Sequence, residues 1–384
     1  MNSCLDYSMR SKCSLVAIAV FILQSSLIGC GGSFRADNGG GANFKSASEE
    51  RILTAPHVSG SSLDVHIDIG SVEVITDPSS EEVQVSASVK AFGETDDEAR
   101  SLLKDVHVDL ERRADGVLTI DCRFPQSQRG SHGACSFKIR VPEAKGARIR
   151  TGNGSVTLKG ISGVTDIDTG IGNVTISDQT GKVVAHSGNG AIQLSNAVGD
   201  AELATNIGSV TVQETSGAVT ARSGNGAIII TGVGGDVDAS TDIGSVTIQD
   251  AAAVIAKSGN GSVSVVKATG TVRAKTSIGQ VKLEQVSGVV EAESGNGSVI
   301  YVPAAGSDHA FTLKTAIGSV NAHLPASAAG SIDADTTVGA VTINGSRQPR
   351  SVNGDRSSKQ VVLSDKGPTS KVHTGNGSIT ITLD

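Results

Sequence analysis

The sequence predicts an all-β protein that folds as a single-stranded parallel β-helix, a solenoid with coils of about 18 residues. Composition is the first observation that predicts it. The 384 residues include 47 Gly but only 7 Phe, 2 Tyr and no Trp, too few rings for a thick globular core. A hydrophobic fraction of 38% with 18% charged residues is too apolar for a disordered chain, and Gly without a three-residue period excludes collagen. A thin β architecture remains.

The spacing of Gly is the second observation. A Gly closes each tetrapeptide of the type Ser-Gly-Asn-Gly or Thr-Xaa-Ile-Gly, and successive closing Gly residues lie 18 residues apart, with one step of 17. Two steps of 21 and one of 38 follow, as if an excursion had been inserted before the last unit. A fixed period of this kind predicts stacked repeats. The predicted corner residues are Asn153, Gly154, Gly172, Asn189, Gly190, Gly208, Asn225, Gly226, Gly244, Asn260, Gly261, Gly279, Asn296, Gly297, Gly318, Gly339, Asn376 and Gly377.

The third observation is the alternation of apolar and polar residues within each unit, with Val210 and Val212 facing the interior and Thr211 facing outward. An up-and-down antiparallel barrel would also satisfy this local pattern, but the fixed step favours parallel coils. Asn and Ile alternate before the closing Gly from unit to unit, which would fit a coil of 36 residues. The inward Val, Ala and Ile side chains fill only a narrow lumen, so the 18-residue coil is preferred.

An export signal with a lipidation site is predicted at residues 1–29. Basic residues precede an apolar run from Leu15 to Leu23, the pattern of a signal peptide. The sequence Leu27-Ile28-Gly29-Cys30 resembles the lipobox of bacterial lipoproteins, which implies cleavage before Cys30 and acylation of Cys30, and hence a membrane anchor. Residues 30–50, rich in Gly and small polar side chains, are expected to form a flexible tether.

Residues 51–146 are expected to form strands, one helix and a hairpin that cap the N-terminal end of the solenoid, ahead of the repeats at 147–384. A cap is needed because a bare terminal rung exposes unpaired backbone groups. The helix is predicted at 95–106, with Thr95 as N-cap and Glu98 three residues later. Its apolar face would consist of Leu102, Leu103 and Val106.

Cys122 and Cys135 remain as one pair once the signal has been removed and Cys30 acylated. They lie in two strand-like runs that are joined by a polar loop. An oxidising envelope favours a disulfide between Cys122 and Cys135 across that expected hairpin. Two free, buried thiols are the alternative.

The order of these segments resembles a known family. A Gly-Ser-Val strand, a short helix with Ala-Arg-Ser-Leu-Leu, a strand that ends in Val141-Pro142 and serial Gly-Asn-Gly-Ser-Val units are similar to the bacterial "putative adhesin" β-solenoid family of unknown function. The resemblance covers roughly residues 51–384. It implies a β-solenoid fold and association with the cell envelope, and it brings no catalytic residues.

No catalytic residue, metal site or cofactor is predicted. The eight His are scattered without metal-ligand spacing. The corners carry Asn, Ile and Ser where calcium-binding β-rolls carry carboxylates. The outward column four residues before each closing Gly has mixed charges interrupted by Ala and Ser, which is typical of a solvated face. That column comprises Arg150, Asp168, His186, Ala204, Arg222, Ser240, Lys257, Lys275, Glu293, Lys314 and Asp335.

The sequence favours a non-enzymatic, lipid-anchored protein of the cell envelope, an adhesin or binding scaffold whose solenoid contacts glycan, peptidoglycan or another envelope protein. A carbohydrate-active β-helix enzyme of the lyase or hydrolase type is the alternative. The net charge of −7 argues against nucleic acid, which needs a basic face. Gly31 after Cys30 favours the outer membrane if the cell has two membranes. The insertion at 345–371 is the expected place for specificity, unless it is a disordered polar excursion.

Overall fold

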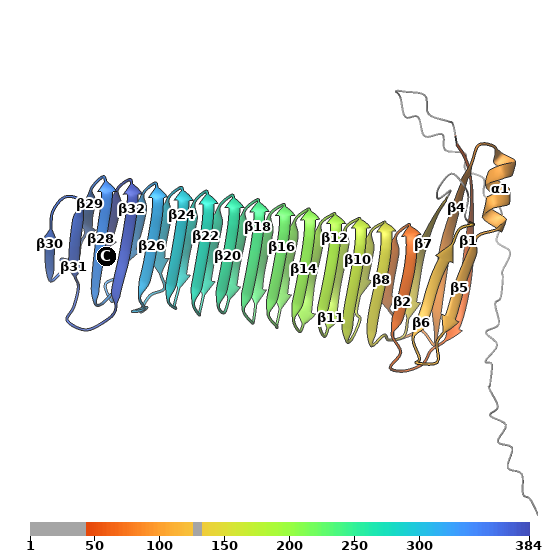
Figure 1. Cartoon of the computed structure of the whole chain (residues 1–384). Coiled ribbons are helices and arrows are strands. Elements are labelled where there is room, and N and C mark those ends of the chain that lie inside the picture. The colour runs from red at the N-terminus through yellow and green to blue at the C-terminus, as the bar shows by residue number, and fades with distance from the viewer. Residues whose placement is uncertain (1–43, 126–132) are drawn as a thin grey trace, which may run out of the picture.

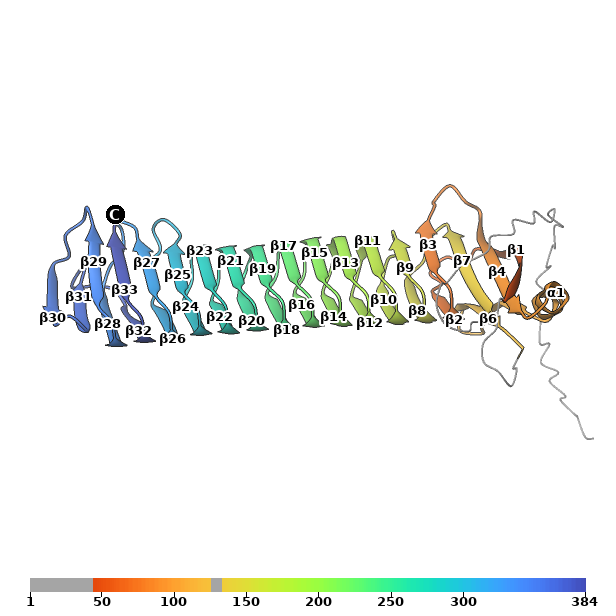
Figure 2. The same cartoon turned by 90° about the horizontal axis from the view of Figure 1, so that it is seen from above.

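The computed structural model describes residues 44–125 and 133–384. It is a straight rod in which two long parallel sheets face each other, with one helix at the N-terminal end (Figures 1 and 2). Each coil contributes one strand to each sheet, and the two strands are joined by sharp corners. The predicted fold class is therefore confirmed.

The two sheets are called sheet A and sheet B. In spatial order, sheet A consists of β1 (Lys45–Pro56), β4 (Glu82–Gly93), β7 (Gly133–Val141), β3 (Val72–Thr76), β9 (Val156–Lys159), β11 (Val174–Thr180), β13 (Ile192–Val198), β15 (Val210–Thr215), β17 (Ile228–Val233), β19 (Val246–Ala251), β21 (Val263–Ala268), β23 (Val281–Val286), β25 (Val299–Pro303), β27 (Val320–Leu324), β33 (Ile379–Leu383) and β29 (Val341–Gly345).

Sheet B runs alongside it. Its strands pair in the order β5 (His107–Arg112), β6 (Leu118–Arg123), β2 (Leu63–Ile69), β8 (Gly146–Asn153), β10 (Val164–Ile171), β12 (Val183–Asn189), β14 (Ala201–Ile207), β16 (Val219–Asn225), β18 (Val237–Ile243), β20 (Val254–Asn260), β22 (Val272–Ile278), β24 (Val290–Asn296), β26 (Phe311–Ile317), β32 (Thr369–Asn376), β28 (Ser331–Val338), β31 (Ser358–Val362) and β30 (Ser351–Gly354).

The register confirms the 18-residue coil. Thr205 pairs with Ser223 in sheet B, and Val210 pairs with Ile228 in sheet A, both in parallel. Parallel pairing at this offset is incompatible with the up-and-down barrel, and it also excludes the 36-residue coil because consecutive units stack directly on each other.

The core is a narrow column of aliphatic side chains between the sheets. Val210 and Val212, which were expected to face inward, are buried, and so are Val219 and Ala221 of the next strand. Tyr301 and Phe311 are the rings of the repeat region, and they lie 5.1 Å apart between their centroids, in contact and buried. They fill the lumen where the step between closing Gly residues lengthens from 18 to 21 residues.

The N-terminal end is capped by antiparallel strands and by the helix. The coil of β2 and β3 stacks directly on that of β8 and β9, so residues 77–125 and 133–145 fold back as the cap. Helix α1 (Asp96–Lys104) begins at the predicted N-cap, where the Glu98 amide donates to Thr95 Oγ1 over 3.1 Å. At the other end of α1, the Arg51 guanidinium donates to the carbonyls of Leu103 and Val106.

One boundary and one strand pairing predicted for this end need correction. The tether was expected to extend to residue 50, but β1 begins at Lys45 and pairs with β4 along its whole length. The expected Cys122–Cys135 hairpin does not form, because β6 pairs with β5 and β2 in sheet B while β7 pairs with β4 and β3 in sheet A.

The C-terminal end departs from sequential stacking. The final coil, β32 and β33, lies between the coil of β26 and β27 and that of β28 and β29. Within the insertion at 345–371, β30 and β31 pair antiparallel, and β31 pairs with β28. The insertion therefore covers the last parallel strand of sheet B, and it is an ordered cap rather than a disordered excursion.

Candidate binding surface

The predicted corner Gly residues are required by close backbone stacking. A Cβ added at Gly226 would lie 1.9 Å from the Gly208 carbonyl oxygen of the preceding coil. At Gly244 the corresponding contact is 2.2 Å, and the φ of +142° disfavours any side chain as well. The role of these Gly residues is structural. Their close backbone stacking fixes the direction in which the neighbouring side chains point.

A ladder of buried hydroxyls, which sequence reasoning missed, supports the corners from within. The Gly208 amide donates to the Asn225 carbonyl of the next coil, and the Gly208 carbonyl accepts a 2.9 Å hydrogen bond from the Ser223 hydroxyl. The same bond recurs along the rod. Its donors are Thr151, Thr169, Ser187, Thr205, Ser223, Thr241, Ser258, Thr276, Ser294, Thr315, Thr374 and Thr336. The signal was present, since Ser or Thr opens every corner tetrapeptide.

The residue before each corner Gly points to solvent and forms a continuous column, here called the Asn/Ile column. Asn and Ile alternate within this one column along the parallel register. In spatial order the column is Ile69, Asn153, Ile171, Asn189, Ile207, Asn225, Ile243, Asn260, Ile278, Asn296, Ile317, Asn376 and Val338. From Ile171 onward its aliphatic members are between 50 and 61% exposed, which is unusual for large apolar side chains in an ordered array.

Two adjacent outward columns of sheet A are uncharged over six successive strands, β11 to β21, and are here called the uncharged face. The residue that follows these columns along each strand is charged at Asp178, Glu214, Asp250 and Lys267, which border the face on one side. Its twelve outward residues are Thr175, Ser177, Gln193, Ser195, Thr211, Gln213, Ile229, Thr231, Thr247, Gln249, Ser264 and Val266. One column contains Thr157, Thr175, Thr211 and Thr247 in register, with Gln193 and Ile229 between them. Hydroxyl and amide groups thus project at the constant spacing of the rungs, about 4.8 Å.

Sheet B presents a charged face over the same part of the rod. The predicted mixed-charge column lies in register on it, with His373 standing between Lys314 and Asp335 because of the altered order of the last coils. Many of its charges pair with a neighbouring rung, as Lys275 does with Glu293 over 2.9 Å and His373 Nδ1 does with Asp335 over 2.6 Å. These exposed pairs describe a solvated face and contribute little to stability.

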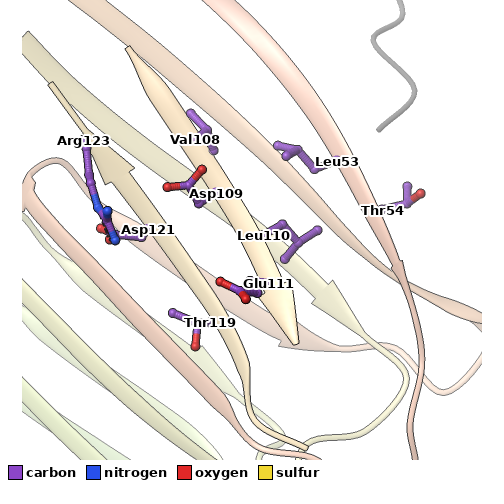
Figure 3. Close-up of a pocket in the computed structure, with 9 residues that line it drawn as sticks. All are labelled: Leu53, Thr54, Val108, Asp109, Leu110, Glu111, Thr119, Asp121 and Arg123. Carbon is purple, nitrogen blue, oxygen red and sulfur yellow. Dashed lines mark hydrogen bonds and ion pairs between the residues drawn. The ribbon is translucent and has the colours of Figure 1, made fainter. Parts of the chain in front are cut away.

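A cavity of about 380 Å³ lies in the N-terminal cap between β1 and the β5–β6 hairpin (Figure 3). Asp109 and Asp121 are cross-strand partners there, with Glu111 nearby on β5. Arg123 donates to the Asp121 carboxylate over 2.7 Å, which raises the pKa of the Arg123 guanidinium. His66 Nδ1 lies 3.5 Å from the other Asp121 oxygen. The sequence did not indicate these carboxylates as a group, because they lie on β5 and β6 of the cap, outside the repeat columns.

Cys122 and Cys135 are both buried, and both are free thiols in the structure. They meet between the two sheets of the cap. A hydrogen bond with the Cys122 side chain, with burial adding to it, raises the pKa of the Cys135 thiol far above its ordinary value. The disulfide stays a prediction, now as a link between sheet A and sheet B.

Cys30 lies outside the described residues, so the lipidation site has no structural description. Among residues 44–125 and 133–384, no group of three or more His, Cys, Asp or Glu side chains is arranged to hold a metal ion. In the same two ranges, no helix has the length and apolarity needed to cross a membrane.

Comparisons with known proteins give limited information. No family model matches the chain, and no curated protein does. A "putative cell adhesion protein" from Clostridium sporogenes is 10% identical, with a TM-score of 0.20, over 88% of this chain and 100% of that one. A "putative adhesin" from Bacteroides fragilis is 15% identical, with a TM-score of 0.37, over 61% and 97%. A "putative lipid binding protein" from Parabacteroides distasonis is 11% identical, with a TM-score of 0.28, over 87% and 96%. Likeness at these scores carries no argument about function.

Proposed function

We propose that this chain is a non-enzymatic, lipid-anchored protein of the cell envelope whose rod binds an extended, uncharged polysaccharide strand, free or as the glycan strand of peptidoglycan, through the uncharged face. The observation that carries the proposal is the contrast between the two sheets. The twelve positions of the two outward columns from β11 to β21 carry no charge, and Asp178, Glu214, Asp250 and Lys267 stand only at their border. The matching strands of sheet B carry Asp166, Asp168, Glu202, Arg222, Asp238 and Lys257.

A charge-free surface of this extent is meaningful because depletion of charge marks the centre of binding interfaces. Desolvating a hydroxyl or an amide costs less than desolvating a carboxylate or an ammonium group, provided that a partner replaces the lost hydrogen bonds. Hydroxyl-rich polysaccharides supply donors and acceptors along their length. The flat sheet holds its own groups on a rigid backbone, so little conformational entropy is lost on binding.

The lipid anchor is part of the proposal and rests on the lipobox-like sequence at Cys30. Acylation would hold the rod at a membrane surface, and the outer membrane is favoured if the cell has two. Labelling of growing cells with an alkyne fatty acid should mark the wild-type chain and leave the Cys30→Ser variant unmarked. Equal labelling of both would remove the anchor from the proposal.

Binding is tested by co-sedimentation of the chain from residue 44 onward with insoluble polysaccharides and with purified peptidoglycan. The proposal expects saturable retention on at least one of them, with no release of soluble sugar on long incubation. Absence of retention on every glycan would refute binding to neutral glycan. Release of sugar would refute the non-enzymatic assignment.

The cap cavity favours one other function, carbohydrate cleavage, because it brings Asp109, Glu111 and Asp121 to one opening (Figure 3). Glycoside hydrolysis uses two such carboxylates. Asp121 is ion-paired with Arg123 and contacts His66, so its role is structural and Asp109 and Glu111 are the candidate catalytic carboxylates. If sugar release is found, the Asp109→Asn and Glu111→Gln variants should abolish it.

A further inference from the structure

The Asn/Ile column is a second surface, separate from the uncharged face, and it extends over thirteen rungs. At about 4.8 Å per rung it is about 58 Å long. Within residues 44–125 and 133–384, the side chains of its Asn members make no hydrogen bond to the protein. Among the residues directly before and after each member of the column, only Asp68 and Asp242 are charged. Half-exposed Ile and free amides thus alternate along a strip that is nearly devoid of charge.

We propose that this column is the contact surface for a second copy of the same chain, with two rods lying side by side, Ile against Ile and Asn against Asn. Both residue types are self-complementary. Apolar side chains gain by covering each other, and a carboxamide carries both donors and an acceptor, so two amides satisfy each other.

The repeat distance identifies the partner. The column repeats every two rungs, about 9.6 Å, and a partner must keep that spacing over the full length to meet every Ile. A second copy keeps it without drift. The alternation of aliphatic residue and Asn is also the same in both directions from Ile243, with Ile69 at one end and Val338 at the other. A two-fold axis at Ile243 would therefore pair Ile207 with Ile278 and Asn225 with Asn260.

The area is adequate for a specific pair. A standard interface covers about 800 Å² on each partner, and a strip about 14 Å wide along this column reaches that value. The corner residues that flank the column are small, mostly Gly and Ser, so two rods can approach closely. Alternation also fixes the register, because a slip by one rung would place every Ile against an amide.

Sedimentation of the chain from residue 44 onward, over a range of concentrations, tests the proposal. The wild type should sediment as a dimer, and the triple variant Ile207→Arg, Ile243→Arg, Ile278→Arg should sediment as a monomer with an unchanged circular dichroism spectrum. The matched control is Val164→Arg, Val198→Arg, Val289→Arg, at apolar residues of similar exposure away from the column. A monomeric wild type, or a dimer that survives the Ile triple variant, would overturn the proposal.

Single cysteines then test the pairing of like with like. Ile243→Cys should form a disulfide-linked dimer under mild oxidation, since Ile243 lies on the proposed axis. Ile207→Cys should cross-link to Ile278→Cys if the rods run in opposite directions, or to itself if they run in the same direction. Cross-linking of a Val198→Cys variant as efficient as that of Ile243→Cys would contradict contact through the column.

Discussion

The Ser223 hydroxyl donates a 2.9 Å hydrogen bond to the Gly208 carbonyl of the preceding coil. The bond satisfies a corner carbonyl whose own amide is already paired with the next coil. Removal of the hydroxyl leaves that carbonyl without its partner in a partly buried site, which costs about 1 kcal/mol. Ser223→Ala is therefore expected to lower the urea midpoint of unfolding.

The matched control is Thr220→Ala, on the same strand but directed outward, which should change the free energy of unfolding by less than about 0.5 kcal/mol. Equal effects of the two substitutions would show that the hydroxyl ladder contributes nothing specific.

Gly226 tests the steric explanation of the corners separately from backbone strain. Its φ lies outside the left-handed region, yet a Cβ there would meet the Gly208 oxygen at 1.9 Å. Gly226→Ala should destabilise the rod by about 3 kcal/mol, as overpacking does. Gly306→Ala, at φ +80° with nothing within 4 Å of the added carbon, should cost about 1 kcal/mol from its backbone alone. A smaller loss for Gly226→Ala would contradict the close stacking.

The C-terminal cap should loosen at low pH. Hydrogen bonds from the Ser357 hydroxyl and from the Ser357 and Ser358 amides lower the pKa of the Asp355 carboxyl from its ordinary value of 3.8. A carboxyl whose pKa is lower in the folded state stabilises that state above the unfolded pKa, and the stabilisation is lost as the pH falls through the folded pKa. Amide exchange in β31 should therefore accelerate on acidification below about pH 4, relative to exchange in β16. An unchanged ratio between the two strands would disprove this link.

Cys122 and Cys135 are expected to form a disulfide when the chain is exported. Chain exported to an oxidising compartment should take up no alkylating reagent in denaturant without prior reduction, and two equivalents after reduction. The reduced, folded chain should react slowly at neutral pH, because the raised pKa of Cys135 keeps its thiol protonated. Uptake of two equivalents without reduction would establish the free thiols instead.

The repeat region was predictable because each coil obeys the same local rules. A Gly recurs where Gly208 must pass close to Gly190, and apolar residues recur where Val210 and Val212 face the lumen. Three features were not predictable for a common reason: they depend on contacts between distant segments. Placement of β32 between β26 and β28, separation of Cys122 and Cys135 into different sheets, and closure of the cap cavity by β1 follow from pairing that no local pattern encodes.

The Asn/Ile column and the uncharged face could be predicted from the sequence only in part. The alternation of Asn and Ile along the chain was evident. That both residue types lie in one column follows only from the strand register, in which Asn189 pairs with Ile207. The uncharged face likewise emerges only when Thr211 and Gln213 are stacked with the outward residues of five other strands.

Glycan binding through the uncharged face is the central claim, and a comparison of the two faces tests it most directly. The dissociation constant for the retained glycan should be measured for a sheet A variant, Thr175→Arg with Thr211→Arg and Thr247→Arg, and for a matched sheet B variant, Val184→Arg with Thr220→Arg and Ser240→Arg. If glycan binds to the uncharged face, the affinity of the sheet A variant should be at least tenfold weaker, about 1.4 kcal/mol, and that of the sheet B variant should be unchanged. Equal affinities, or a loss confined to the sheet B variant, would contradict it.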